Sequence, residues 1–110
     1  MRTSRRGAEV FERAIVEGVA NIASGMAEPE GYSSPVLSSH YLDAVRLVGM
    51  RLRARGPDGL LYCPFCGRRR GPFTPRGYYL HLLRSHRQEI LELVQSEASR
   101  IASVSRALRP

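Results

Sequence analysis

The sequence contains no lysine, only two cysteines and no long hydrophobic run. All 17 basic side chains are arginines, set against 10 acidic ones, so the net charge is +7. No stretch of about 18 uncharged apolar residues occurs, which argues against a transmembrane helix. The N-terminus is basic, but Glu9, Glu12 and Glu17 interrupt what would be the apolar part of a signal peptide. We therefore expect no membrane association and an intracellular location, in the cytoplasm or nucleoid or in a nucleus.

The sequence also lacks the residue patterns that are typical of an enzyme active site. The chain has no paired carboxylate near its histidines, no phosphate-cradling glycine loop and no nucleophile with a nearby base. Its 110 residues amount to one small domain, which can bury only a modest core. We therefore expect a binding or structural protein without a small-molecule substrate, and not an enzyme.

The positive charge is concentrated in one segment. Residues 1–60 carry eight arginines and seven acidic residues, and residues 88–110 carry three of each. Residues 61–87 carry six arginines and no acidic residue. Arginine binds phosphate as a planar fork and stacks on bases, which favours nucleic acid as a partner. A genome or growth-temperature bias toward arginine would give the same composition, and so would a solvated basic loop without a partner.

Apolar residues recur at helical spacing through most of the chain and predict a mainly α protein. A first helix is expected over residues 7–25. Its apolar stripe consists of Phe11, Ile15, Val19, Ile22 and Met26. A loop over residues 27–35, rich in Pro, Gly and Ser, separates it from a second helix. Together the two helices form a predicted N-terminal region, residues 1–59.

The second helix is expected to begin near Ser38 or Ser39, either of which can cap it. Gly56 and Pro57 are expected to stop it. Its apolar stripe is Leu42, Val45, Val48 or Gly49, and Leu52, and its last turns carry Arg51, Arg53 and Arg55. A further helical pattern starts at Gly77 and continues almost to the end of the chain.

The C-terminal helix, residues 88–110, continues this pattern and carries a seam for packing. The seam positions are 83, 87, 90, 94, 97, 101, 104 and 108, where Arg87 and Glu97 weaken an otherwise apolar stripe. Two arrangements stay open. The seam can dock on the N-terminal helices of the same chain, or it can pair with a second copy to form a homodimer.

Two cysteines and two histidines follow one another as Cys63-x2-Cys66-x14-His81-x4-His86. Zinc prefers four such ligands in a tetrahedron, and a closed set of four protein ligands is typical of a structural site. A disulfide or a redox-active CxxC motif is the alternative, but the redox motif needs a βαβ context that the sequence lacks. We therefore predict one structural Zn²⁺ ion bound by these four residues.

This segment, residues 60–87, resembles the C2H2 zinc-finger family. The resemblance implies a ββα-like finger in which Leu60–Tyr62 is strand-like and Phe73 supplies the core aromatic. The chain departs from the family in its long spacer, 14 residues where 12 are usual, and in Tyr78, which stands where the family has leucine. The histidines are five positions apart, which leaves them about 140° apart on an ideal helix. We therefore predict a wide turn between them, or a break with Ser85 capping a new helix and Gln88 completing the capping box.

The finger is also the predicted nucleic-acid interface. Its candidate phosphate contacts are Arg68, Arg69, Arg70, Arg76, Arg84 and Arg87. By resemblance, the base-reading positions map to Thr74, Gly77 and Leu80, of which the last two cannot form bidentate bonds to a base. Arg76 is the one good candidate reader nearby, so phosphate contacts should dominate.

The family resemblance favours DNA over RNA and implies a small transcriptional regulator or a chromatin-associated factor. Two alternatives stay open. One is a protein-interaction or scaffold module that contains a structural zinc finger. The other is an RNA-binding or ribonucleoprotein component.

Overall fold

Helices make up most of the computed structural model, which describes residues 5–53, 55–67 and 70–108. The elements in chain order are α1 (Arg5–Ser24), the short 3-10 helix η1 (Pro29–Gly31), α2 (Ser39–Leu52), α3 (Pro75–Ser85) and α4 (Arg87–Ala107). The mainly α class expected from the sequence is therefore confirmed. Within the described ranges, no helix has the length and apolar character required to cross a bilayer.

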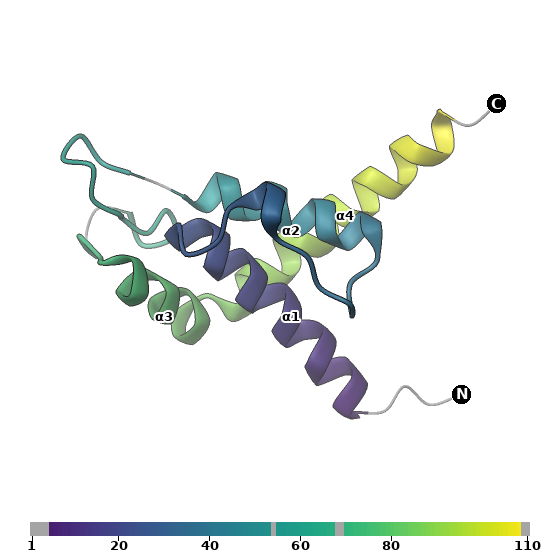
Figure 1. Ribbon diagram of the computed structural model, residues 1–110, viewed down its shortest axis with the longest axis horizontal. Helices are drawn as coiled ribbons and strands as arrows, with labels where there is room; N and C mark the ends of the chain where they lie inside the picture. The colour runs from purple at the N-terminus through teal and green to yellow at the C-terminus, as the bar shows by residue number, and fades with distance from the viewer. Residues whose placement is uncertain (1–4, 54, 68–69, 109–110) are drawn as a thin grey trace.

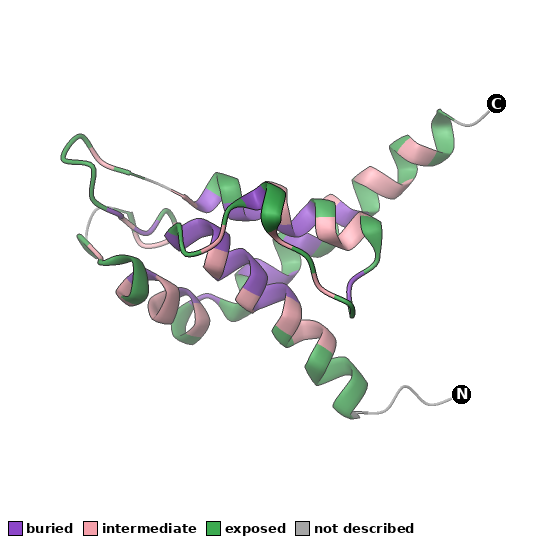
Figure 2. Ribbon diagram, viewed as in Figure 1, coloured by how far each residue is buried: buried purple, intermediate pink, exposed green. Residues whose placement is uncertain are grey.

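Helix α1 runs through the middle of the molecule and packs against the other three α-helices. α2 lies between α1 and α4, while α3 packs mainly on α1 (Figure 1). The start of α1 and the end of α4 project from this body, and Figure 2 shows that burial is concentrated where the helices cross. The largest fully buried side chains are Tyr78, Ile15, Ile22, Leu61, Leu82 and Ile90. The core is therefore shared by all four α-helices, since α2 adds the buried Val45 and Val48, and by the segment that precedes Cys63.

The first helix follows the predicted stripe except at its end. Ile15, Val19 and Ile22 are completely buried, as expected, whereas the Met26 side chain is 53% exposed. The prediction for Met26 was wrong because α1 ends at Ser24, and the N–H of Gly25 bonds back to the carbonyl of Ile22. Met26 therefore lies beyond the helix and off its buried stripe.

Helix α2 begins at Ser39, as predicted, with Ser38 at the N-cap position but without a capping hydrogen bond from its side chain, and it ends at Leu52 rather than at Gly56. The predicted end was wrong for a reason that lies in tertiary contacts. Arg53 leaves the helix, and its guanidinium donates hydrogen bonds to the carbonyls of Ile22 and Ala27 at the end of α1. Ile22 lies in the last turn of α1 and Ala27 follows that helix, so Arg53 stabilises the end of α1 and the turn after it, and these bonds hold Arg53 at the C-cap of α2.

The first half of the predicted C-terminal seam packs within the chain. Ile90 and Val94 are completely buried in the common core. The two charged seam residues lie at the margin as ion pairs, Arg87 with Glu12 of α1 at 3.3 Å and Glu97 with Arg51 of α2 at 2.7 Å. Docking on the N-terminal helices is therefore observed for this half of the seam.

The segment before the cysteines is held by single bridges and not by strands. Leu61 forms isolated antiparallel bridges with Arg55 and with Phe73, and the N–H of Phe73 donates to the Leu61 carbonyl at 2.8 Å. The described residues form no β-strand longer than such a single bridge. Where the family resemblance led us to expect a β-hairpin, the chain forms only these two bridges, with Leu61 buried between them.

We predict that Gly49→Ala destabilises the protein. A Cβ at this position of α2 would lie 2.7 Å from the Cβ and Cγ2 atoms of Ile22 on α1, and these atoms cannot move without the backbone. Overpacking of this kind should lower the free energy of unfolding by about 1–2 kcal/mol, after allowance for the better helix propensity of alanine. Chemical denaturation measures the change. Gly31→Ala is the control, because a Cβ there meets nothing within 4 Å. Equal stability of the two variants would contradict the close packing of α1 on α2.

Candidate metal centre

The two cysteines lie in a tight turn that directs both sulfurs to one side. Cys63 is buried and Cys66 is partly buried, and both are free thiols. Gly67, which ends the turn, has φ +66°, a conformation that favours glycine. Hydrogen bonding from the backbone N–H groups of Cys66 and Phe65 acts to lower the pKa of the Cys63 thiol. The turn therefore surrounds this sulfur with donors that favour its thiolate form.

The histidines come from the end of α3 and from the break that follows it. Thr74 caps α3, its hydroxyl accepting the N–H of Gly77 at 3.0 Å, and His81 projects from the second turn of the helix. His86 has φ −132° and ψ 25°, so it belongs to neither helix: it is the C-cap of α3 and the N-cap of α4. The predicted break is confirmed, although it falls one residue after Ser85. It removes the angular mismatch that a continuous helix would impose.

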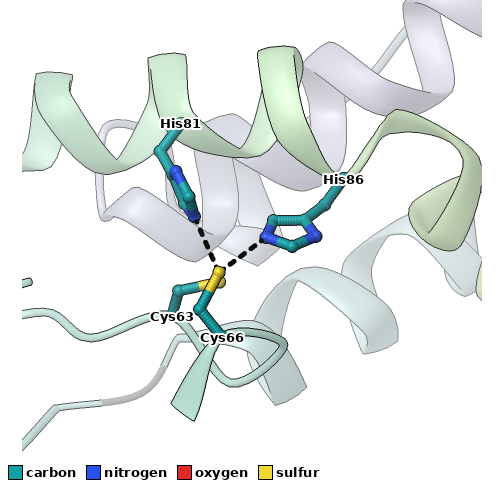
Figure 3. A group of neighbouring side chains, drawn as sticks. All are labelled: Cys63, Cys66, His81 and His86. Atoms are coloured by element: carbon teal, nitrogen blue, oxygen red, sulfur yellow. Dashed lines mark hydrogen bonds between the residues drawn. The ribbon is translucent and has the colours of Figure 1, made fainter. Parts of the chain in front are cut away.

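The break brings all four predicted ligands together. One nitrogen or sulfur atom from each of Cys63, Cys66, His81 and His86 lies within 4.8 Å of the other three. The Cys66 sulfur is 3.5 Å from Nε2 of His81 and 3.2 Å from Nε2 of His86 (Figure 3). The cluster could therefore hold one metal ion.

The donor set and its dimensions fit a zinc ion. Zn–S bonds of about 2.3 Å and Zn–N bonds of about 2.0–2.1 Å at tetrahedral angles place S and N about 3.5 Å apart. The two sulfur–nitrogen separations, 3.5 and 3.2 Å, agree with this edge length. Two thiolates and two imidazoles fill the tetrahedron and leave no position for water. Such a site is structural in character and has no catalytic position.

Aromatic rings fix the orientation of both imidazoles. Phe65 stacks on the His86 ring with centroids 4.7 Å apart, and Phe73 stacks on the His81 ring at the same distance. Phe73 also stacks on Tyr78 at 5.8 Å. The core aromatic that the resemblance assigned to Phe73 is thus next to a ligand, despite the longer spacer.

Glu89 is a residue of the site that the sequence analysis missed. Both of its carboxylate oxygens lie near Nδ1 of His86, at 3.0 and 3.1 Å. A proton held on Nδ1 leaves the lone pair of Nε2 for the metal. Glu89 stands three residues after the cap residue, the position we had assigned to Gln88 by placing the cap one residue too early. The spacing His86-x-x-Glu89 was the signal that could have identified it.

Burial shifts the acid–base behaviour of the ligands. Burial raises the pKa of the Cys63 thiol in the absence of a cation, even though the N–H donors of the turn act in the opposite direction. Burial, and then the charges of His86 and Arg70, lower the pKa of His81. The imidazole of His81 therefore stays neutral to lower pH than usual, and neutral imidazole is the form that binds metal. The thiols, by contrast, must lose their protons when a cation enters.

Tyr78 joins the cluster to the helical core. Its side chain is completely buried, and its hydroxyl donates a hydrogen bond to the carbonyl of Leu52 at the end of α2. Burial, with the charges of Cys63 and Cys66 added, raises the pKa of Tyr78. The hydroxyl thus stays protonated and satisfies a carbonyl that has no partner within its helix.

The candidate phosphate contacts occupy different environments. Arg70, Arg76 and Arg84 are exposed, and the structure pairs none of these three with a carboxylate in its described parts. Arg87 is also exposed but forms the ion pair with Glu12. Arg68 and Arg69 lie outside the described residues. Three of the six candidates are therefore available to an anion without the loss of an ion pair.

Comparisons with protein-family models, with curated proteins and with solved structures give no match to this chain. The likeness of residues 60–87 to a C2H2 finger therefore rests on the four ligands, their spacing and their geometry.

We predict that Glu89→Gln lowers the affinity for zinc by about 10- to 100-fold, the usual effect of losing an outer partner of a histidine ligand. The amide keeps the size of the side chain but cannot hold the Nδ1 proton as a carboxylate does. Competition with a chromophoric chelator measures the affinity. Glu92→Gln is the control, because this exposed carboxylate contacts Gln88 and not a ligand. Equal affinities for the two variants would exclude a role of Glu89 in the centre.

Proposed function

We propose that the protein is a zinc-binding protein of the C2H2 type that binds nucleic acid, DNA in preference to RNA, through the arginines of its finger. One observation carries the proposal. Arg70, Arg76 and Arg84 are exposed on a segment, residues 61–87, that contains no acidic residue. A bound zinc would not reduce this charge, because two thiolates and one Zn²⁺ sum to zero. The segment therefore attracts phosphate and can release counterions on binding.

The exposed face of α3 supports a linear contact with a phosphate backbone. Arg76, Leu80 and Arg84 follow one another at intervals of four residues and lie within an arc of about 80° on the helix. The opposite side of α3 is covered, since Leu82 is buried and the helix packs on α1. Of α3, the face that carries the exposed Arg76 and Arg84 is therefore open to a large polyanion.

Contacts to base edges contribute little in this proposal. Of the three positions that resemblance assigns to base reading, Thr74 uses its hydroxyl to cap α3, while Gly77 and Leu80 offer no hydrogen-bonding side chain. Arg76 is the remaining candidate reader. A single finger covers only about 3 base pairs, so the binding that we propose is dominated by phosphate. It suits a small regulator or a chromatin-associated factor inside the cell.

We predict that the double variant Arg76→Gln/Arg84→Gln binds duplex DNA more weakly and with less dependence on salt. Removal of each arginine–phosphate interaction should reduce the slope of log K against log salt by about 0.9, so the slope should fall by about 2. Fluorescence anisotropy between about 50 and 200 mM salt measures it.

The matched control for this experiment is Arg13→Gln/Arg106→Gln. It removes the same two charges from exposed positions on α1 and α4 and should leave the slope nearly unchanged. An equal weakening of binding in both double variants would reduce the proposal to a general effect of net charge. Absence of duplex binding at about 50 mM salt, where such contacts are strongest, would reject it.

A protein-interaction module is the second candidate function, favoured by the free end of α4. Beyond Ala98 the seam continues through Ile101, Val104 and Leu108. Val104 is 47% exposed and Leu108 is 79% exposed, on the part of the helix that projects from the body (Figure 1). Pairing of this end with a second copy would cover these residues.

We predict, for this second candidate, that the wild-type protein dimerises with rising concentration and that Val104→Asp abolishes the dimer. Sedimentation equilibrium measures the mass. A monomer at every concentration tested would remove self-association through α4.

A further inference from the structure

We propose that the hollow beside the start of α3 is a binding site for an unpaired nucleobase, so that the protein prefers nucleic acid with a single-stranded or bulged nucleotide. This inference rests on the proposed nucleic-acid binding and specifies its ligand. The hollow has a volume of about 290 Å³, near the lower end of the range for small-molecule sites. It lies on the finger but apart from the four metal ligands, none of which lines it.

The wall of the hollow is apolar and includes an aromatic ring. Leu60 and Leu61 come from the segment before the cysteines, and Pro72, Phe73 and Pro75 come from the segment that leads into α3. The two segments are held together by the bridge between Leu61 and Phe73. Unpaired bases are typically bound by stacking on aromatic and apolar side chains of this kind.

The hollow has one arginine in its lining, Arg55, and two more beside lining residues in the sequence, Arg70 and Arg76; together we call them its cationic rim. Arg55 belongs to the lining itself and donates a hydrogen bond to the Gly59 carbonyl at 2.7 Å, which holds its guanidinium in place. Arg76 follows Pro75 in the chain, and Arg70 stands two residues before Pro72. Asp58, which precedes Gly59 of the lining, accepts hydrogen bonds from the Tyr62 hydroxyl and the Leu60 N–H. An apolar wall with a cationic rim matches a base attached to its phosphate, whereas an apolar peptide side chain would need no cation.

The hollow also continues the basic face of α3. Thr74 and Pro75, at the start of the helix, belong to the lining, and Arg76 lies in the first turn. The loop before Cys63 and the start of α3 lie at the same end of the molecule (Figure 1). A strand with phosphates along Arg84 and Arg76 would therefore reach the hollow with its next nucleotide. A base locked in a duplex cannot enter, since it must first leave its stack.

Phe73 connects this site to the metal centre. Its ring lines the hollow and also stacks on His81 at 4.7 Å. Removal of the metal would free His81 and the ring that rests on it. Removal of the metal should therefore lower the affinity for DNA with an unpaired base. This loss should be larger than any loss of affinity for a perfect duplex.

The test compares three DNA probes: a short duplex, the same duplex with one unpaired 2-aminopurine, and the same bulge with an abasic nucleotide. We expect the 2-aminopurine bulge to bind about tenfold more tightly than the abasic bulge, the scale of one stacked base, with quenching of its fluorescence. The variant Leu60→Ser removes part of the wall without a change of charge and should abolish this preference. Leu60 is 45% exposed, so its replacement should leave the fold intact.

The matched control is Leu93→Ser on α4, where the leucine is 37% exposed and outside the lining. It should keep the full preference. Equal binding of the two bulges, or equal behaviour of the two variants, would overturn the nucleobase site while duplex binding persists. Failure of all three probes to bind at low salt would instead reject the nucleic-acid function itself. NMR can also test a protein ligand for the hollow. If a leucine-containing acidic peptide shifts the signals of Leu60 and Leu61 and a nucleotide does not, the hollow binds a protein segment and the proposal is overturned.

Discussion

The convergence of two thiols and two imidazoles on one point is the constraint on which the rest of the structure depends. The four donors come from two segments that are 15 residues apart at their nearest ligands, and their atoms approach to within 4.8 Å. Such a cluster removes polar groups from water, which is costly unless a partner compensates. A cation supplies that compensation, and zinc binding in related peptides contributes roughly 10–16 kcal/mol. The helix break at His86 and the stacking of Phe65 and Phe73 on the ligands are consistent with that requirement.

The four candidate ligands and the helical core are packed together. Leu61, Cys63 and Tyr78 belong to the same buried cluster as the helices, and Tyr78 ties the finger to the end of α2. The segment that carries the four ligands is thus packed into the helical core and does not form a separate unit. One side of α3 is occupied by α1, which leaves its basic face and the hollow at its start for a partner. A small protein gains a rigid surface in this way without a large core of its own.

Local pattern predicted the helices and the ligands, whereas tertiary contacts decided the features that it missed. The four ligands and the break followed from spacing, because five positions on a helix cannot bring His81 and His86 together. The end of α2 could not be predicted, because it depends on bonds from Arg53 to carbonyls 26 and 31 residues away in the chain. Glu89 was missed because the cap was placed one residue too early. The hollow could not be predicted either, since its walls come from separate segments that only the fold brings together.

X-ray absorption at the zinc edge of the purified protein tests the central claim most directly. The account predicts one zinc per chain with two sulfurs at about 2.3 Å and two nitrogens at about 2.0–2.1 Å. A first shell that contains oxygen, a shell with fewer than two sulfurs, or protein purified without metal would contradict it. In each of those cases the side chains of Cys63, Cys66, His81 and His86 would not form a closed structural centre.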